Sequence, residues 1–328
     1  MRVKSRRVWT PAETERDYIR NAITAAAPRT RSILWSFARW LEHDRGLVLG
    51  TIVVRIQSVR RFVEAACTSR RTSGALALRA LTARYVEDFF IKYVRVSGPV
   101  ARRSMQSAMR LLLKFAASRR WVDDGLAAAV PSLRRYRLAG LPRALPETEL
   151  HRLLEAMGTK VTSARDQAIV WLLACYGVRR GQVSALRLED VDWSARTILF
   201  RAHKRGKSIQ HQLLPAVAKA LVRYLRSERS PSGDREFVFV RKRPPHFRMS
   251  PAAVTLTVQR CMRQAELTPR SPQALRHSFA SRLLRVGQSL KTIADLLGHR
   301  SFGAVAIYAK VDRPRLLEAA VEWPEVRS

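Results

Sequence analysis

Acidic side chains are scarce in this chain of 328 residues, which contains 26 Asp and Glu against 61 Lys and Arg and has a net charge of +35. The imbalance is even along the chain, because residues 1–140 hold 28 basic and 10 acidic side chains and residues 141–328 hold 33 and 16. A surplus of this size favours a polyanion as partner. We therefore expect both halves of the chain to contact nucleic acid, although an arginine-rich surface inherited from a GC-rich genome is the alternative.

Long apolar runs are also missing. The longest, AIVWLLACYGV at 168–178, is too short to span a bilayer, and the amino terminus lacks the apolar core of a signal peptide. A basic protein of the membrane surface is therefore less favoured, and we expect no membrane contact. The sequence predicts a cytoplasmic protein that acts at the bacterial nucleoid.

Cysteine is rare as well. Cys67, Cys175 and Cys261 lie far apart among apolar neighbours, and neither a CxxC nor an HxxxH pair is present. This pattern is typical of buried thiols and not of a disulfide framework or a zinc site. We expect three buried thiols, no structural metal and no cofactor.

A break in the apolar pattern divides the chain. The segment PSLRRYRLAGLPRALPETEL at 131–150 contains three prolines and four arginines and has no helical or strand period, which is typical of a linker. The sequence predicts a first domain at 1–135, a basic linker at 136–146 and a second domain at 147–328.

The first domain contains four amphipathic stretches. Apolar residues at helical spacing predict helices over 33–41, 52–63, 86–93 and 105–116, the first of them capped by Thr30. These helices would form a small bundle. Basic residues on their outward faces are candidates for gripping DNA phosphates, with a solvated helix face as the alternative: Arg60, Arg61, Arg102 and Arg103.

The second domain combines helices with one hairpin. A helix begins at Thr162 or Ser163, is apolar nearly all round and ends at Gly177, which predicts the buried centre of the domain. The stretch TILFRAHKRGKSIQHQLLP at 197–215 alternates around a basic turn and predicts a β-hairpin. The expected fold class is mainly α with a small β-hairpin. The hairpin tip is basic, and we expect two of its residues to contact DNA: Arg205 and Lys207.

Further helices are expected to begin at Ser271, Ser289 and Ser301, and the segment RPRLLEAAVEWP near the carboxyl terminus is amphipathic. It could dock on a neighbouring subunit or fold back on its own domain.

Side chains suited to metal-free attack on a phosphodiester follow one another in the second domain. Arginines bind phosphate oxygens in a bidentate manner, a lysine can protonate the leaving oxygen, and a tyrosine can serve as nucleophile. Any one of these residues would mean little by itself. The set, in chain order, is Arg179, Lys204, Arg276, His299 and Tyr308.

At these residues the chain resembles the tyrosine recombinase (phage integrase) family. The first box of the family resembles YGVRRGQVSALRLEDVDW at 176–193, with Arg179 in the place of the first catalytic arginine. The second resembles SPQALRHSFASRLL at 271–284, with Arg276 as the second arginine, and LGHRSFGAVAIYAK at 297–310 supplies His299 and Tyr308. The lysine of the family's hairpin falls on Lys204, with Lys207 as the alternative.

Two positions depart from the family pattern. Gln273 stands where the family usually has a histidine, and a glutamine amide cannot transfer a proton as an imidazole can. Gln273 is still a candidate for orienting a phosphate oxygen or the Tyr308 hydroxyl. Gln182 replaces a frequent glutamate, which would affect packing or a supporting hydrogen bond. His277 resembles the family's structural histidine and is not assigned to catalysis.

The resemblance implies an enzyme that cuts and rejoins DNA through a 3′-phosphotyrosyl intermediate. It also implies a helical core-binding domain and a catalytic domain that form a C-shaped clamp on a double-stranded recombination site, and a homotetramer that joins two sites. Two other functions stay open: relaxation of supercoils by a type IB topoisomerase, and a DNA-binding regulator of recombinase descent that Gln273 has disabled.

Overall fold

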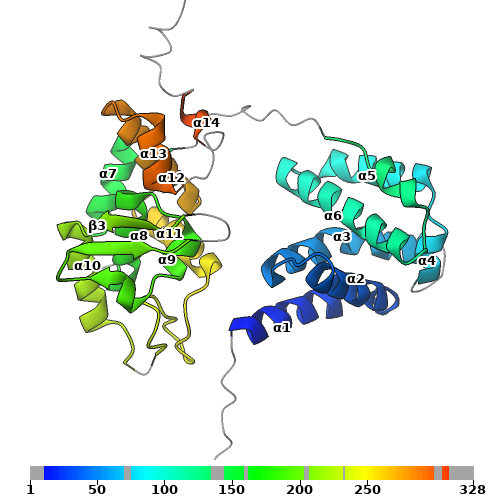
Figure 1. The fold of residues 1–328 in the computed structure, drawn as a ribbon, viewed down its shortest axis with the longest axis horizontal. Coiled ribbons are helices and arrows are strands. Elements are labelled where there is room, and N and C mark those ends of the chain that lie inside the picture. Colours follow the sequence, from blue (N-terminus) through cyan, green and yellow to red (C-terminus); the bar gives the residue numbers. More distant parts are fainter. Residues whose placement is uncertain are drawn as a thin grey trace, which may run out of the picture. The chain divides into compact units, whose positions relative to one another are not determined.

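The computed structural model describes residues 11–69, 75–133, 144–158, 162–202, 207–231, 233–298 and 305–309 (Figure 1). The chain divides into two compact units, Met1–Tyr136 and Arg137–Ser328, each with a hydrophobic core of its own. Within the described ranges, no helix combines the length and the apolar character that a bilayer crossing requires.

Unit 1 is a helical bundle. Its α-helices are α1 (Pro11–Thr24), α2 (Arg31–His43), α3 (Leu49–Ser69), α4 (Ala75–Arg79), α5 (Ala83–Val96) and α6 (Pro99–Ser118), with 3₁₀ turns η1 (Pro28–Thr30) and η2 (Asp124–Ala129). The long helices α3 and α6 pack against each other and are joined by a hydrogen bond of 2.7 Å between the hydroxyls of Ser58 and Ser104. All four helices expected in this half of the chain are confirmed, whereas α1 and α4 were not expected.

The expected cap at Thr30 is wrong in its detail. Thr30 is the residue before α2, but its hydroxyl makes no capping bond and donates instead to the carbonyl oxygen of Ala27, at 2.7 Å. The side chain therefore closes the 3₁₀ turn that precedes the helix, because a threonine hydroxyl can bond to nearby backbone carbonyls as well as to backbone N–H groups.

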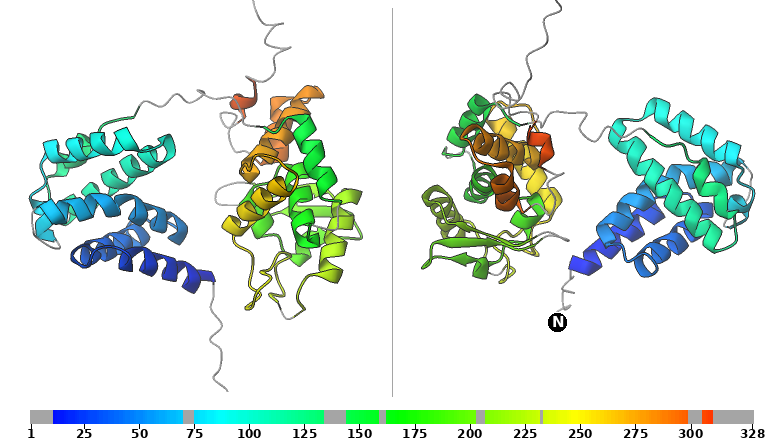
Figure 2. Two further views of the ribbon diagram at one scale, coloured as in Figure 1. Left: turned by 180° about the vertical axis from the view of Figure 1, so that it is seen from behind. Right: turned by 45° about the horizontal axis from the view of Figure 1, so that its top comes forward.

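Unit 2 is built around one central helix. Its helices are α7 (Glu147–Ala156), α8 (Ala164–Tyr176), α9 (Arg180–Ser184), α10 (Pro215–Ser227), α11 (Pro251–Gln264), α12 (Pro272–Arg285), α13 (Leu290–Leu297) and α14 (Ala306–Ala309), with the 3₁₀ turn η3 (Leu188–Asp190). Helix α8 packs against α10, α11 and α12 (Figure 2). All its residues are buried except Trp171 and Cys175. The predicted buried centre is confirmed, and Cys175, expected to be buried, is half-buried.

A three-stranded antiparallel sheet lies beside these helices, in the order β1 (Val191–Asp192), β2 (Thr197–Phe200) and β3 (Ile209–Gln212). Strands β2 and β3 form the expected hairpin, with Thr197 opposite Gln212 and Phe200 opposite Ile209. The fold class, mainly α with a small hairpin sheet, is confirmed. The tip residues Lys204 and Arg205 lie outside the described residues.

The start of unit 2 lies slightly upstream of where the sequence suggested. Leu145, assigned to the linker, is 5% exposed and belongs to the core of unit 2. Its backbone N–H donates to the Ser278 hydroxyl on α12 at 2.8 Å, and that hydroxyl lies 3.3 Å from the Leu145 carbonyl oxygen. The residues just before α7 are therefore anchored to α12, and the remainder of the predicted linker, up to residue 143, lies outside the described residues.

Candidate active site

The end of α8 sets the position of the first arginine. Gly177 ends the helix in the left-handed conformation, with φ of 58°, and the chain then turns so that Arg179 directly precedes α9. The backbone N–H of Arg179 donates to the Gln182 side chain at 3.0 Å. Gln182, for which a packing or supporting role was expected, thus fixes the backbone that carries Arg179.

Arg276 occupies the interior of unit 2. It lies on the first turns of α12 and is 2% exposed. Its guanidinium donates to the carbonyl oxygens of Gly177, at 2.7 Å, and Leu297, at 2.9 Å. Both carbonyls lie at the C-terminal ends of helices, α8 and α13, and such ends carry partial negative charge. The second arginine is thereby held between the segments that precede Arg179 and His299.

Tyr308 lies on α14, in a small hydrophobic cluster formed with α12 and α13, and is 1% exposed. Burial raises the pKa of its hydroxyl, while the guanidiniums of Arg276 and Arg179 act in the opposite direction. Burial also lowers the pKa of Arg276 to about 9, with Arg179 contributing and Tyr308 opposing. Burial lowers the pKa of Arg179 too, and Tyr308 opposes it. The three side chains therefore act on one another within one site.

His277, which the sequence interpretation did not assign to catalysis, is a member of this site. Its Nδ1 lies 2.9 Å from the Tyr308 hydroxyl, and the two rings are 5.5 Å apart with an interplanar angle of 60°. Burial and the neighbouring Arg276 lower the pKa of His277. The available signal in the sequence was its position next to Arg276, but nothing there indicated contact with a residue of another helix.

Gln273 is placed differently from His277. It lies on the first turn of α12 and is exposed. The Tyr308 hydroxyl, which Gln273 was a candidate to orient, contacts His277 instead. The Gln273 side chain is therefore open to solvent, on the same helix as His277.

The hairpin approaches the same region from its base. Gly298, which ends α13 with φ of 63°, packs so closely on β3 that an added Cβ would lie 2.5 Å from Ile209 Cδ1 and 3.3 Å from the Lys207 carbonyl oxygen. Lys207 is exposed beside this contact. Its neighbours Lys204 and Arg205, and His299 after Gly298, lie outside the described residues.

The candidate phosphate contacts of unit 1 fall into two pairs. Arg61 and Arg103 are exposed. Arg60 is half-buried and lies 3.7 Å from Glu64, and Arg102 donates to the Ser97 carbonyl oxygen at 2.6 Å. The exposed pair is thus available to a ligand, whereas Arg60 and Arg102 already have contacts within unit 1.

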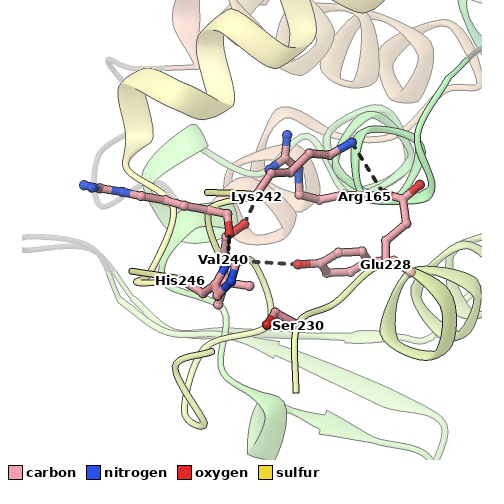
Figure 3. A pocket seen from close by; sticks show the side chains of 8 residues that line it. Arg165, Glu228, Ser230, Val240, Lys242 and His246 are labelled. Carbon is pink, nitrogen blue, oxygen red and sulfur yellow. Dashed lines mark hydrogen bonds and ion pairs between the residues drawn. The ribbon is translucent and has the colours of Figure 1, made fainter. Parts of the chain in front are cut away.

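A pocket of unit 2 lies at the start of α8, the end of the helix opposite to Gly177. Glu228 accepts hydrogen bonds from the first two backbone N–H groups of α8 and lies 3.8 Å from Lys242, while the Arg165 guanidinium donates twice to Asp166, at 3.0 and 3.1 Å. The charged groups at this end of α8 are therefore paired with one another. Because Glu228 follows α10, these contacts connect the start of α8 to the end of α10. Its volume is about 270 Å³, and it is lined by Arg165, Tyr224, Glu228, Ser230, Val240, Arg241, Lys242 and His246 (Figure 3).

Comparison with known proteins gives consistent matches over both units. The model of the phage integrase family matches residues 143–315. The chain is 32% identical over 294 residues to the putative integrase/recombinase y4rA of Sinorhizobium fredii, covering 88% of this chain and 70% of that protein. It is 30% identical over 316 residues to the tyrosine recombinase XerC of Bradyrhizobium diazoefficiens, covering 90% and 96%.

Solved structures share the fold. The XerH site-specific recombinase bound to palindromic difH substrate matches with a TM-score of 0.66 at 18% identity, covering 99% of this chain and 100% of that one. A lambda integrase dimer bound to a COC′ core site matches with a TM-score of 0.64 at 16% identity, covering 90% and 99%.

Proposed function

The chain belongs to the phage integrase family and is a tyrosine-type site-specific DNA recombinase, and from this premise we propose which of its residues cut and rejoin the DNA strand. Tyr308 is the nucleophile and forms a 3′-phosphotyrosyl bond with the scissile phosphate. The observation that supports this assignment is that the charges of Arg179 and Arg276, two arginines from distant parts of the sequence, both act on the buried hydroxyl of Tyr308.

Arg179 and Arg276 stabilise negative charge on the nucleophile and on the phosphate. A phenol in water has a pKa near ~10 and is a poor nucleophile at neutral pH. Arg179 and Arg276 favour the phenolate of Tyr308, in opposition to burial. They also bind the nonbridging oxygens of the phosphate, whose negative charge grows in the transition state. The carbonyls of Gly177 and Leu297 hold the Arg276 guanidinium in place before DNA arrives.

The remaining groups serve the phosphate and the leaving oxygen. Lys204 protonates the departing 5′ oxygen, with Lys207 as the alternative, and His299 adds a hydrogen bond to the phosphate. Gln273 donates its amide to a nonbridging oxygen, which its exposed position permits. Because the phosphodiester energy is kept in the phosphotyrosyl bond, a 5′ hydroxyl of another strand reverses the step without an external energy source.

Access to the nucleophile requires movement. Tyr308 is 1% exposed, so a phosphate reaches its hydroxyl only when the residues that cover it rearrange. The cluster that holds Tyr308 is small compared with the two main cores, and small satellite clusters open more readily than cores. DNA binding would shift this equilibrium by favouring the open arrangement.

Both units take part in binding DNA. In unit 1, Arg61 and Arg103 contact DNA phosphates directly, and Arg60 and Arg102 do so after they release their present partners. In unit 2, Arg205 and Lys207 contact phosphates from the hairpin. The two units enclose the duplex as a clamp, and four subunits join two sites. The solved relatives include a lambda integrase tetramer bound to a Holliday junction, which supports this assembly. The protein would act on chromosomal or element DNA in the bacterial cytoplasm.

The test is covalent capture on nicked suicide substrates. The unaltered protein should form a denaturant-resistant DNA adduct, and Tyr308→Phe should bind the same DNA with equal affinity but form none. Tyr18→Phe, which removes a hydroxyl from an exposed tyrosine of unit 1, is the matched control and should form the adduct. An adduct formed by Tyr308→Phe would refute the assignment.

The two alternative functions make different predictions. The relatives carry recombinase and integrase names, which favours neither of them. A topoisomerase would relax supercoiled DNA as a monomer without paired sites. A disabled regulator would bind its site and form no adduct at any pH.

A further inference from the structure

The contact between His277 and Tyr308 joins a histidine directly to the hydroxyl of the proposed nucleophile. Within the ranges that the structure describes, His277 is the side chain hydrogen-bonded to the Tyr308 hydroxyl, at 2.9 Å through Nδ1. The tilted ring contact, with centroids 5.5 Å apart, fixes the direction from which the imidazole approaches. His277 lies on α12 next to Arg276, whose guanidinium is anchored to the carbonyl oxygens of Gly177 and Leu297.

The chemistry at Tyr308 lacks a proton acceptor elsewhere in the described site. Attack by a phenol requires loss of its proton, and burial makes that loss harder by raising the pKa of Tyr308. Arg179 and Arg276 are cations and cannot accept a proton, and the amide of Gln273 cannot titrate. His277 is the described side chain that touches the hydroxyl and can exist as a neutral base.

We propose that His277 is the general base of the cleavage step and accepts the Tyr308 proton at Nδ1 while the tyrosine oxygen attacks the phosphate. This inference rests on the proposed function of Tyr308. As the O–P bond forms, the proton passes to Nδ1 and leaves an imidazolium, and the P–O5′ bond breaks with protonation of the leaving oxygen by the lysine. In the reverse step the 5′ oxygen attacks, and the departing tyrosine oxygen takes the proton back from Nδ1.

The surroundings of His277 keep it in the accepting form. Among the described residues, the charged or titratable groups that act on it are Arg276, on its own helix, and Tyr308 on α14, and Arg179 acts in turn on both of these. Burial and Arg276 lower the pKa of His277. The neutral imidazole therefore predominates at neutral pH, and its contribution to the rate is lost as the pH falls through that lowered pKa.

The experiment measures the single-turnover rate of covalent-complex formation for the unaltered protein, His277→Ala and His277→Asn. Asparagine places an amide oxygen near the position of Nδ1, so it keeps an acceptor but cannot take a proton. We expect both variants to lose roughly 100-fold or more at neutral pH, the usual range for removal of a general base. His151→Asn, at an exposed histidine of α7, is the control and should keep the full rate.

Three further readouts separate the general base from other roles. The loss should persist on a substrate with sulfur at the bridging 5′ position, because that change relieves only the leaving group. Added imidazole should restore part of the rate of His277→Ala. Between about pH 5.5 and about 8.5, the unaltered protein should show a rise and then a plateau, whereas the variants should rise throughout as solvent removes the proton.

Several results would overturn the inference. Full activity of His277→Asn would reduce His277 to a group that orients the hydroxyl, and faster cleavage by either variant would make the contact a restraint on Tyr308. If the variants do not fold, the pH profile of the single-turnover rate of the unaltered protein tests the inference. A rate that does not depend on pH on the acid side would exclude a histidine as the base. Absence of any adduct from the unaltered protein would instead refute the proposed function.

Discussion

Arg276 donates a hydrogen bond of 2.7 Å to the carbonyl oxygen of Gly177, the residue that ends the central helix of unit 2. A second bond of 2.9 Å joins the guanidinium to Leu297, the last residue of α13. One side chain thus links the segments that lead to Arg179 and His299. The Arg276 guanidinium therefore contributes to the geometry of the site as well as to its positive charge.

Replacement of Arg276 by lysine should therefore strongly reduce DNA cleavage. An ammonium keeps the charge but cannot bond to two carbonyls and bind phosphate in a bidentate manner. We expect cleavage to fall by roughly 100-fold or more while DNA affinity changes little, since the lost interactions act mainly in the transition state. Arg285→Lys, at an exposed position of the same helix, is the control. Parallel losses of binding and cleavage would make Arg276 an ordinary phosphate contact.

Gly177 should not accept a side chain. A Cβ there would lie 2.6 Å from Phe279 Cδ1 and 2.9 Å from Leu297 Cδ2, and φ is positive. We expect Gly177→Ala to lower the free energy of unfolding by about 2 to 4 kcal/mol and to reduce cleavage, because both arginines depend on this turn. Urea unfolding and adduct formation measure the two effects.

Alanine substitutions at two other glycines separate the effect of crowding from the cost of a positive φ. Gly287 has φ of 81° with open space around it, so Gly287→Ala should show only the conformational cost, about 1 to 2 kcal/mol. Gly50, in α3 with open space and no positive φ, should tolerate alanine without loss of stability. A Gly177→Ala protein no less stable than Gly287→Ala would show that the crowding is relieved by small shifts.

The identity of the leaving-group acid can be tested by sulfur substitution. Lys204→Ala should cleave ordinary DNA roughly 100-fold more slowly or worse and should recover on a substrate with a bridging 5′ sulfur, which leaves without a proton. Lys207→Ala, a neighbour on the same hairpin, should show little of this rescue. The reverse pattern would move the assignment from Lys204 to Lys207.

Gln273→His should change the pH dependence of cleavage. The position is exposed, so an imidazole fits without crowding and should titrate near ~6.5. Since His277 already contacts the Tyr308 hydroxyl, the new side chain should act on the phosphate, and its charged form should give the larger benefit. The ratio of the single-turnover rates of variant and unaltered protein should therefore increase as the pH falls below about 6.5. Gln288→His, exposed beyond α12, is the control, and a ratio independent of pH would contradict the prediction.

Sequence patterns predicted the helices whose apolar faces are long and regular. The periodic residues of α2, α3, α5 and α6 mark their buried faces, and the continuous apolar run of α8 marked the centre of unit 2. Helix α1 escaped notice because its buried face is short and partly made of alanine: Ile19, Ala22 and Ile23. Thr30 was misread because a hydroxyl next to a helix start can bond in either direction along the chain.

The site was predictable as a set of residue types but not as a set of contacts. Arg179, Arg276 and Tyr308 could be named because phosphate chemistry requires such groups. The role of His277 depends on the packing of α14 against α12, which brings together side chains 31 positions apart. Gln273 lies one turn earlier on the same face of α12 and is exposed, whereas His277 is half-buried against Tyr308, and the spacing in the sequence does not reveal this difference.

The anchoring of Leu145 on Ser278 limits how unit 2 can be isolated for study. A fragment that begins at residue 147 would expose the Ser278 hydroxyl and the apolar site that Leu145 fills, two positions along α12 from Arg276. A fragment that begins at residue 137 keeps both contacts. Work on the separate unit should therefore start from the longer fragment, and loss of cleavage in the shorter one should be ascribed to a damaged α12 before it is ascribed to the absence of unit 1.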